Sequence, residues 1–385
     1  MKKALIVGGN SGIGLAICKN LLYKYDHLYI VGKDDICLSA LPDSMRRDIE
    51  EKTSFYKMNF VNDDLSVFDS ISDIDTLIIT AGFGRIALFE DLTEPEIKNI
   101  MNVDFNVIVR IIKKYYNKIK SNEAFYTAVM GSIAGHVASP YFSVYGAAKA
   151  GLCSFIENLN VELAAAGIEN RILDVSPGSL KGTAFNGGSN DLSLVDGVAA
   201  DIIDKMLSRE MLFIPQYDEI YKDVIARYHS DSQKFGAESY AYKENSGRIS
   251  SKPQVVVGYL SGTFDLFHIG HLNLLRRAKQ QCDYLIVGVH NSGAWKGKET
   301  FIPFEERCEI IENIKFVDKV VESPDEDSDA WDIYHYDKLF VGSDYKGTER
   351  FKRYERLFGD RVEIVYFPYT KGTSSTQLRD AISKK

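Results

Sequence analysis

The sequence predicts an α/β protein with two doubly wound parallel-sheet domains. In both halves of the chain, short apolar segments alternate with longer segments of helical periodicity. Such alternation is typical of βαβ units, whose parallel sheet is covered by helices on both faces. The length of 385 residues exceeds one ordinary core and suits two domains. The halves share the alternation but no motif, so they are not an internal repeat.

The N-terminal domain is expected to span residues 1–228. Its helical periodicity is clearest over residues 13–25 and 145–165. Its strands are expected at residues 5–7, 28–31, 76–79, 128–130 and 172–175. Residues 229–252 are polar and weakly periodic, and we interpret them as an exposed linker. Whether this linker is partly helical or packed stays open at this point.

A smaller C-terminal domain is expected over residues 253–385, where the alternation resumes. The expected elements are a strand at 255–259, a helix at 270–281, and strands at 284–289, 338–341 and 362–367. The architecture is therefore a Rossmann-type N-terminal domain followed by a smaller Rossmann-like one.

Composition excludes several classes of function. The hydrophobic fraction of 45% and charged fraction of 26% are those of an average globular protein. A formal charge of -8 argues against a general nucleic-acid-binding protein. No apolar run approaches the roughly 20 residues of a membrane helix. The five cysteines are odd in number and widely spaced, so we expect free thiols in a reducing cytoplasm and no metal or redox site built from them.

A glycine-rich turn lies between the first strand and the first helix. Its residues include Gly8, Asn10, Ser11, Gly12, Ile13 and Gly14. Glycines allow a tight turn, and a helix N-terminus offers N–H groups and a positive dipole end to a pyrophosphate. The turn favours a dinucleotide site, although a glycine-rich turn on its own is also compatible with a purely structural role.

Tyr145 and Lys149 are one helical turn apart, so they share a helix face. Reduction of a carbonyl needs a proton donor beside the developing alkoxide, and a phenol with a pKa near ~10 serves poorly unless a cation stabilises its phenolate. Lys149 can supply that charge, and Ser132, at the end of a strand, can bond the carbonyl oxygen. The alternative is that Tyr145 and Lys149 merely share a helix face.

The spacing Gly-x-x-x-Gly-Ile-Gly, together with Ser132, Tyr145 and Lys149 in order, resembles the short-chain dehydrogenase/reductase family. The resemblance implies a nicotinamide cofactor. It also implies that Asn102 supports a proton-relay water. Further matches to cofactor-contacting positions are Asn59, Ala81, Gly82, Pro177 and Gly178. The family's usual Asn-Asn-Ala-Gly is replaced by Ile79-Thr80-Ala81-Gly82, and Asn59 stands where an aspartate normally meets the adenine.

The second expected strand ends in Gly32-Lys33-Asp34, which bears on cofactor choice. An NAD-dependent relative would usually carry an acidic side chain at position 32 to hold the ribose hydroxyls. Its absence, and the lysine that follows, favour NADPH. The alternative is that Lys33 is a solvated surface residue and Asp34 holds the ribose.

Arg85 and Lys181 lie in the two loops expected to flank the substrate cleft. Cations at such places are candidates for binding a substrate phosphate, with plain surface charge as the alternative.

The most specific string of the chain follows the first strand of the C-terminal domain and opens a helix. It includes Gly262, Thr263, Phe264, Asp265, His268 and His271. A single histidine is more often a satisfied core residue, but two of them at a helix N-terminus after Gly-Thr-Phe-Asp are hard to explain by packing. The pair lacks a third protein ligand at usable spacing, so we expect no protein-bound metal.

This string resembles the cytidylyltransferase family, especially the glycerol-3-phosphate cytidylyltransferases. The resemblance, which runs from about Val255 to Ala381, implies that His268 and His271 contact the triphosphate and stabilise the transition state at the α-phosphorus. It adds Lys296 or Lys298 and Arg307 as partners, and CTP with Mg²⁺ as its counter-ion. The remaining implied nucleotide-binding positions are Asp344, Thr370, Ser374, Ser375 and Thr376. Tyr369 replaces the family's arginine.

The two expected activities meet in one substrate class. Reduction of a ketose phosphate gives an alditol phosphate, which CTP then activates to a CDP-alditol and pyrophosphate. Ribulose or xylulose 5-phosphate is favoured, and the resemblance implies a role in surface polysaccharide synthesis. The alternatives are another nucleotide such as ATP, or an N-terminal domain that serves as a non-catalytic oligomerisation or sensing module. Relatives of the first domain commonly pair through the helices around Tyr145, so a homo-oligomer, dimer or tetramer, is expected.

Overall fold

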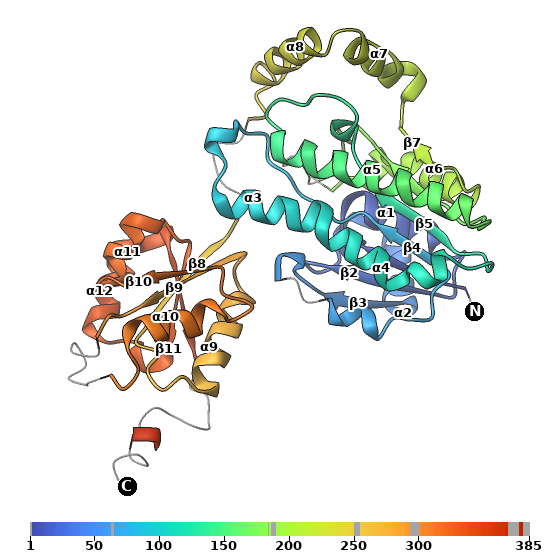
Figure 1. Cartoon of the computed structure of the whole chain (residues 1–385). Helices are drawn as coiled ribbons and strands as arrows, with labels where there is room; N and C mark the ends of the chain where they lie inside the picture. The colour runs from blue at the N-terminus through green and yellow to red at the C-terminus, as the bar shows by residue number, and fades with distance from the viewer. Residues whose placement is uncertain are drawn as a thin grey trace. The chain divides into compact units, whose positions relative to one another are not determined.

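The computed structural model describes residues 2–62, 65–183, 185, 190–249, 255–292, 300–368 and 377–379. The chain divides into two compact units, Met1–Pro253 and Gln254–Lys385 (Figure 1). Each unit contains its own parallel sheet with helices around it, so the predicted fold class is confirmed.

The first unit is organised around a seven-stranded sheet in the order β3-β2-β1-β4-β5-β6-β7. Its strands are β1 (Lys3–Val7), β2 (His27–Gly32), β3 (Thr53–Lys57), β4 (Thr76–Ile79), β5 (Tyr126–Met130), β6 (Ile172–Val175) and β7 (Leu212–Phe213). All neighbours pair in parallel. The order reverses between β1 and β4, which is where an open α/β sheet places its ligand crevice. The two edge strands β3 and β7 were not predicted from the sequence, because they lack a fully buried apolar run.

Helices cover both faces of this sheet. They are α1 (Gly12–Leu21), α2 (Asp43–Lys52), α3 (Glu94–Met101), α4 (Val107–Ile119), α5 (Ser143–Ala165) and α6 (Asp196–Leu207). Ile6 of β1 belongs to the apolar cluster that holds α1 and α6, whereas its neighbours Leu5 and Val7 belong to the cluster that holds α4 and α5. Successive strand residues point to opposite faces, so one strand supplies both cores.

The segment expected to be a linker contains helix. After α7 (Lys222–Ser230) comes helix α8 (Ser232–Glu244), whose N-cap Asp231 accepts a hydrogen bond from the backbone of Lys234 at 2.9 Å. Phe235 of α8 is buried, and the rings of Tyr240 and Tyr141 lie 4.9 Å apart. The segment is therefore packed against the first unit.

The second unit has a five-stranded parallel sheet in the order β10-β9-β8-β11-β12. Its strands are β8 (Val257–Gly262), β9 (Tyr284–Val289), β10 (Lys319–Glu322), β11 (Lys338–Gly342) and β12 (Glu363–Phe367). Its helices include α9 (Ile269–Lys279), α10 (Phe304–Glu312), α11 (Asp327–Tyr334) and α12 (Glu349–Phe358). The order reverses between β8 and β11. The edge strand β10 was not anticipated, because its central valines are only half-buried.

Two further expectations concern the chain as a whole. Within the described residues, no helix combines the length and apolar character that crossing a bilayer requires. The five cysteines are free thiols, and Cys18, Cys153 and Cys282 are buried.

Candidate active sites

The first candidate site brings Ser132, Tyr145 and Lys149 together. Tyr145 and Lys149 lie on α5, and Ser132 follows the carboxyl end of β5. The Lys149 ammonium is 5.6 Å from the centroid of the Tyr145 ring. Burial raises the pKa of Tyr145, while the charge of Lys149 and a hydrogen bond with Ser132 act to lower it. The arrangement holds a phenol beside a cation, as acid–base catalysis at a carbonyl requires.

A buried carboxylate that was not predicted from the sequence, Asp104, completes this group. The Nζ atom of Lys149 lies 3.2 Å from Oδ1 of Asp104 and donates to the backbone oxygen of Met130 at 2.9 Å. Burial raises the pKa of Asp104 to about 6, although Lys149 acts in the opposite direction. A Cβ atom at Gly82 would lie 2.6 Å from Oδ1 of Asp104, so glycine leaves room for the pair. A carboxylate two positions after Asn102, within a helix that packs on the core, was the available signal.

Asn102 lies at the start of the turn that carries Asp104. Its side chain donates to the backbone oxygen of Phe60 at 3.4 Å and accepts from Asn106 at 2.9 Å. It begins a π-helical turn, Asn102–Asn106, which places Asp104 and not the Asn102 side chain against Lys149. The side chain of Asn102 therefore helps to shape this turn, and its support of a proton-relay water stays a prediction.

The glycine-rich turn is closely packed. Gly8 has a φ of +89°, in the left-handed region that favours glycine, and a Cβ atom at Gly14 would lie 2.1 Å from the Gly8 carbonyl oxygen. Ser11 is the N-cap of α1, but its side chain makes no capping hydrogen bond. The amide of Gly12 donates to the Asn190 side chain at 3.2 Å. The turn is thus tight and leads directly into the N-terminus of α1, which is the arrangement that binds a pyrophosphate.

The end of β2 accommodates Asn10 in place of an acidic side chain. A Cβ atom at Gly32 would lie 2.3 Å from Oδ1 of Asn10, so that space is already filled by the amide. Lys33, the next residue, is exposed. A carboxylate at position 32 would require the Asn10 side chain to move.

The other expected cofactor positions lie at the carboxyl ends of neighbouring strands. Asn59 follows β3 and caps its own turn, accepting from the Val61 amide at 3.1 Å. Ala81 and Gly82 follow β4, where the Ala81 amide donates to Val7 at 3.1 Å. Pro177 follows β6 and accepts from the Ile133 amide at 3.0 Å, and Gly178 lies directly against the Tyr221 hydroxyl. These positions form one edge of the sheet, where dinucleotides bind in such folds.

Arg85 is corrected as a candidate for phosphate binding. Its side chain is only 2% exposed, and its Nε atom lies 2.9 Å from the Glu96 carboxylate, which is 1% exposed. Glu96 also closes the capping box of α3 with Thr93. A guanidinium neutralised in this way holds a loop to a helix and has little charge left for a substrate. Lys181, in the other loop, is exposed.

A polar network lies behind Ser132. His136, Cys153 and Asp174 offer one donor atom each, all within 4.8 Å of one another. The Ser176 hydroxyl lies 3.0 Å from Nε2 of His136 and donates to Asp174 at 2.7 Å. Hydrogen bonds through Ser176 therefore account for this grouping, which stiffens the ends of β5 and β6 beneath Ser132.

The second candidate site is the histidine pair at the start of α9. His268 is the N-cap, and its Nδ1 atom accepts a hydrogen bond from the Gly270 amide at 3.0 Å. That bond leaves the proton on Nε2 as a donor. Burial lowers the pKa of His268, so its imidazole is neutral at pH 7. The His268 and His271 rings stack with centroids 4.0 Å apart, so both imidazoles lie together at the N-terminal end of α9.

The preceding loop is held in an unusual backbone shape. Phe264 and Leu266 have φ values of 53° and 50°, a region that non-glycine residues seldom adopt. Asp265 stabilises the loop by accepting from the amides of Phe301 and Ile302 at 3.1 and 3.0 Å. Its other oxygen lies 2.5 Å from the Arg379 guanidinium. Asp265 therefore ties the histidine loop to two later segments, while Gly262 and Thr263 join that loop to β8.

Arg307, expected as a catalytic cation, is corrected to a positioning residue. It is fully buried and donates to four backbone oxygens at 2.5–2.9 Å. The acceptors are Ile302, Thr263, His290 and Asn291. These bonds hold the histidine loop, the end of β9 and the start of α10 together. A guanidinium with its donors used in this way is not available to a phosphate.

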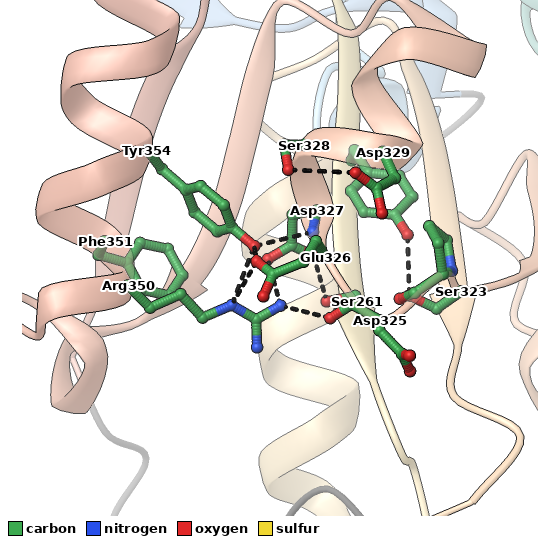
Figure 2. Close-up of polar contacts among 12 residues, drawn as sticks. Ser261, Ser323, Asp325, Glu326, Asp327, Ser328, Asp329, Arg350, Phe351 and Tyr354 are labelled. Atoms are coloured by element: carbon green, nitrogen blue, oxygen red, sulfur yellow. Dashed lines mark hydrogen bonds and ion pairs between the residues drawn. The ribbon is translucent and has the colours of Figure 1, made fainter.

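Figure 2 shows a charged cluster that anchors the end of β8. The Ser261 hydroxyl donates to the buried Asp327 at 2.7 Å, and the Tyr354 hydroxyl accepts from the amide of Asp327 and from Arg350, both at 2.9 Å. Glu326 accepts from the Tyr354 hydroxyl and pairs with Arg350 at 3.4 Å. The cluster thus joins α11 and α12 to the strand that leads into the histidine loop.

The remaining expected positions divide into two groups. Asp344 is exposed and follows β11, beside the point where the strand order reverses. Outside the described residues lie Lys296, Lys298, Thr370, Ser374, Ser375 and Thr376.

Comparison with known proteins assigns different relatives to the two units. A family model described as short chain dehydrogenase matches residues 2–192, and one described as Cytidylyltransferase-like matches residues 259–381. Glycerol-3-phosphate cytidylyltransferase of Bacillus subtilis is 36% identical over 126 residues, covering 32% of this chain and 93% of that protein. Carbonyl reductase family member 4 of Xenopus tropicalis is 25% identical over 207 residues, covering 54% and 83%.

Among solved structures, a short chain dehydrogenase/reductase from Burkholderia phymatum in complex with NAD is similar with a TM-score of 0.50 and 15% identity. The match covers 60% of this chain and 94% of that chain. At this identity, the likeness concerns the fold of the first unit.

Proposed function

We propose that the product of this chain is a CDP-alditol. The chain belongs to the short chain dehydrogenases through its N-terminal domain and to the cytidylyltransferase-like proteins through its C-terminal domain. The substrates are a ketose phosphate, NADPH and CTP. The observation that carries the proposal is that one chain holds both the Ser132, Tyr145 and Lys149 group and the His268 and His271 pair. A reductase makes a hydroxyl and a cytidylyltransferase activates a phosphate, so an alditol phosphate connects them.

In the first domain, Ser132 holds the ketone oxygen and Tyr145 gives it a proton. NADPH, when bound, supplies the hydride that the carbonyl carbon receives. The Lys149 charge stabilises the phenolate that Tyr145 leaves behind. Together these steps convert the ketone, the hydride and one proton into a secondary alcohol.

NADPH as the cofactor is supported by the shape of the turn and the end of β2. A Cβ atom at Gly8 or Gly14 would clash with neighbouring backbone, so glycine at both positions permits the tight turn that a pyrophosphate site uses. The space at Gly32 is filled by the Asn10 amide, with no carboxylate to repel a 2′-phosphate, and Lys33 supplies a positive charge next to it.

In the second domain, the phosphate of the alditol attacks the α-phosphorus of CTP and pyrophosphate leaves. The neutral His268 donates from Nε2, and the stacked His271 lies at the same end of α9. Preorganised donors at a helix N-terminus stabilise charge that develops on the phosphate oxygens. Mg²⁺ accompanies CTP through the phosphates and not through a protein cage.

Ribulose or xylulose 5-phosphate is the proposed ketose, and the product is proposed to serve surface polysaccharide synthesis. We place the enzyme in the cytoplasm, where NADPH and CTP are made, and propose a homo-oligomer that pairs through helices around α5. Neither nucleic acid nor membrane is a proposed partner.

The test follows both half-reactions on the purified full chain. NADPH and NADH oxidation is measured across a panel of ketose phosphates, and pyrophosphate release is then followed after addition of CTP or ATP with Mg²⁺. We expect one ketose phosphate to drive NADPH oxidation and its product to drive CTP-dependent pyrophosphate release. Pyrophosphate release from a ready-made alditol phosphate, with no ketose reduced, would refute the coupled reaction.

A further inference from the structure

Helix α8 places a lysine beside the loop that follows Ser132. The Nζ atom of Lys243 donates to the Ser139 hydroxyl at 2.6 Å and to the Pro140 carbonyl oxygen at 2.8 Å. The same atom lies 5.2 Å from the centroid of the Phe142 ring. Phe142 in turn packs on the catalytic phenol, with 5.3 Å between its ring centroid and that of Tyr145. Lys243 is therefore one aromatic ring away from the reacting group.

No carboxylate within the described ranges forms an ion pair with Lys243. Burial, and to a smaller extent the nearby charge of Arg248, lowers the pKa of this lysine to about 8. The contrast is with Arg85, whose guanidinium pairs with Glu96 at 2.9 Å. A half-buried cation beside a second cation, without an anion, is unfavourable on its own and becomes favourable when an anion binds.

The helical segment that carries Lys243, residues 217–244, contacts the loop that follows β5 and the loop that follows β6. Tyr240 and Tyr141 rings lie 4.9 Å apart, and the Tyr221 hydroxyl lies against Gly178 in the loop after β6. The segment is thus packed against the loops that follow β5 and β6, and this packing holds Lys243 in place.

We propose that Lys243, with Arg248 and the Ser139 hydroxyl, forms the subsite that binds the phosphate group of the reductase substrate. This inference rests on the proposed function and adds the residues that recognise a phosphomonoester. An ammonium group has three donors, and two already bond to Ser139 and Pro140, so one remains for a phosphate oxygen. Ser139 accepts from Lys243 and keeps its own O–H as a second donor. Arg248, whose guanidinium carbon is 5.7 Å from the Tyr242 ring centroid, adds charge.

The test compares Lys243→Met and Lys243→Arg in the full chain with NADPH present. For the phosphorylated ketose we expect Lys243→Met to raise KM roughly 10- to 100-fold with little change in kcat, since hydrogen bonds to charged groups contribute about 1.5–3 kcal/mol. The same variant should leave kcat/KM for the unphosphorylated ketose unchanged. Lys243→Arg should retain most of the affinity. Lys222→Met is the matched control, because Lys222 is exposed in the same segment and pairs with Asp218.

A second measurement does not depend on turnover. Binding of inorganic phosphate to the NADPH-loaded protein is followed by calorimetry, and we expect it to be lost in Lys243→Met and in Arg248→Gln but kept in Lys222→Met. If the wild type binds phosphate through Lys243 but reduces no ketose phosphate, the subsite stands and the proposed substrate fails. If a ketose phosphate is reduced and Lys243→Met changes neither its KM nor phosphate binding, the subsite is wrong. Equal losses with phosphorylated and unphosphorylated ketose would also overturn it.

Discussion

The ammonium group of Lys149 lies 3.2 Å from Asp104, and the two side chains are only 2% and 0% exposed. This pair places a negative charge behind the cation that serves the Tyr145 phenol. Asp104 acts to raise the pKa of Tyr145, whereas Lys149 acts to lower it. Two opposed charges, that of Lys149 and that of Asp104 paired with it, therefore influence the acidity of the phenol.

Replacing Asp104 by asparagine should move the pH profile of the reductase to lower pH. Without the carboxylate, the full charge of Lys149 favours the Tyr145 phenolate, so the pKa of the phenol falls. Ketone reduction needs the protonated phenol, and its alkaline limb should therefore appear at lower pH than in the wild type. The reverse oxidation should gain activity at lower pH. Rates of ketone reduction and of alcohol oxidation measured across pH test this prediction, and profiles that coincide for variant and wild type would contradict it.

The same carboxylate makes the stability of the first domain depend on pH. The pKa of Asp104 is about 6 in the folded protein against a usual value of 3.8, so the native state binds the proton more tightly than the unfolded state. The stabilisation is complete below pH 3.8 and is lost as pH rises through about 6. The free energy of unfolding of the wild type, minus that of Asp104→Asn, should therefore fall across this window. Denaturant titrations at a series of pH values measure the difference.

Tyr145→Phe should abolish reduction without affecting nucleotidyl transfer. Loss of the proton donor is expected to lower the rate of NADPH oxidation by about 10²–10⁴-fold, the usual contribution of general acid catalysis. Pyrophosphate release from a ready-made alditol phosphate and CTP should be unchanged, because the histidine pair lies in the other domain. Phe142→Leu, which alters a neighbouring ring but no acid, is the comparison. If Tyr145→Phe reduced the ketone at the wild-type rate, the assignment of Tyr145 as the proton donor would be wrong.

His268→Ala should have the opposite selectivity. Loss of one preorganised donor at the phosphate is expected to lower pyrophosphate release by about 10²–10³-fold. NADPH oxidation should continue at the wild-type rate, and alditol phosphate should accumulate. Product analysis by chromatography shows both effects in one reaction. An intact transfer rate in this variant would show that the histidine loop does not contact the reacting phosphates.

Arg307→Met should lower the stability of the second domain, because Arg307 positions a loop and does not contact the reacting phosphates. The four backbone oxygens that Arg307 binds would lose their donors inside the protein, at about 1–3 kcal/mol for each group left unsatisfied. A calorimetric scan should show a lower transition temperature for the second domain and an unchanged one for the first. Arg353→Met, which removes a side chain 57% exposed, serves as the control and should leave both transitions in place.

Several features of the sites were predictable from the sequence because they depend on neighbours along the chain. Tyr145 and Lys149 share a helix face, the glycine turn follows a buried strand, and His268 and His271 open a helix. Each of these patterns combines local geometry with a chemical requirement. The apolar strands of both sheets were predictable for the same reason, since a fully buried parallel strand is a continuous apolar run.

Other features depended on contacts between distant segments. Arg85 and Arg307 were interpreted as cations for phosphates, yet Glu96 neutralises the first and four backbone oxygens from three segments occupy the second. A residue type reports its charge but not its partners. The edge strands β3, β7 and β10 were missed because half-buried strands lack a continuous apolar run.

The sequence by itself determined the order of two α/β domains and the identity of the chemical groups at each site, because helix period, strand burial and motif spacing are local properties. Tertiary structure alone decided that Asp104 faces Lys149, that Arg307 positions a loop, and that Lys243 of a polar segment reaches the loop after Ser132. Burial, charge compensation and hydrogen-bond partners come from residues far apart in the chain. For that reason they cannot be inferred from spacing and become visible only when the chain is folded.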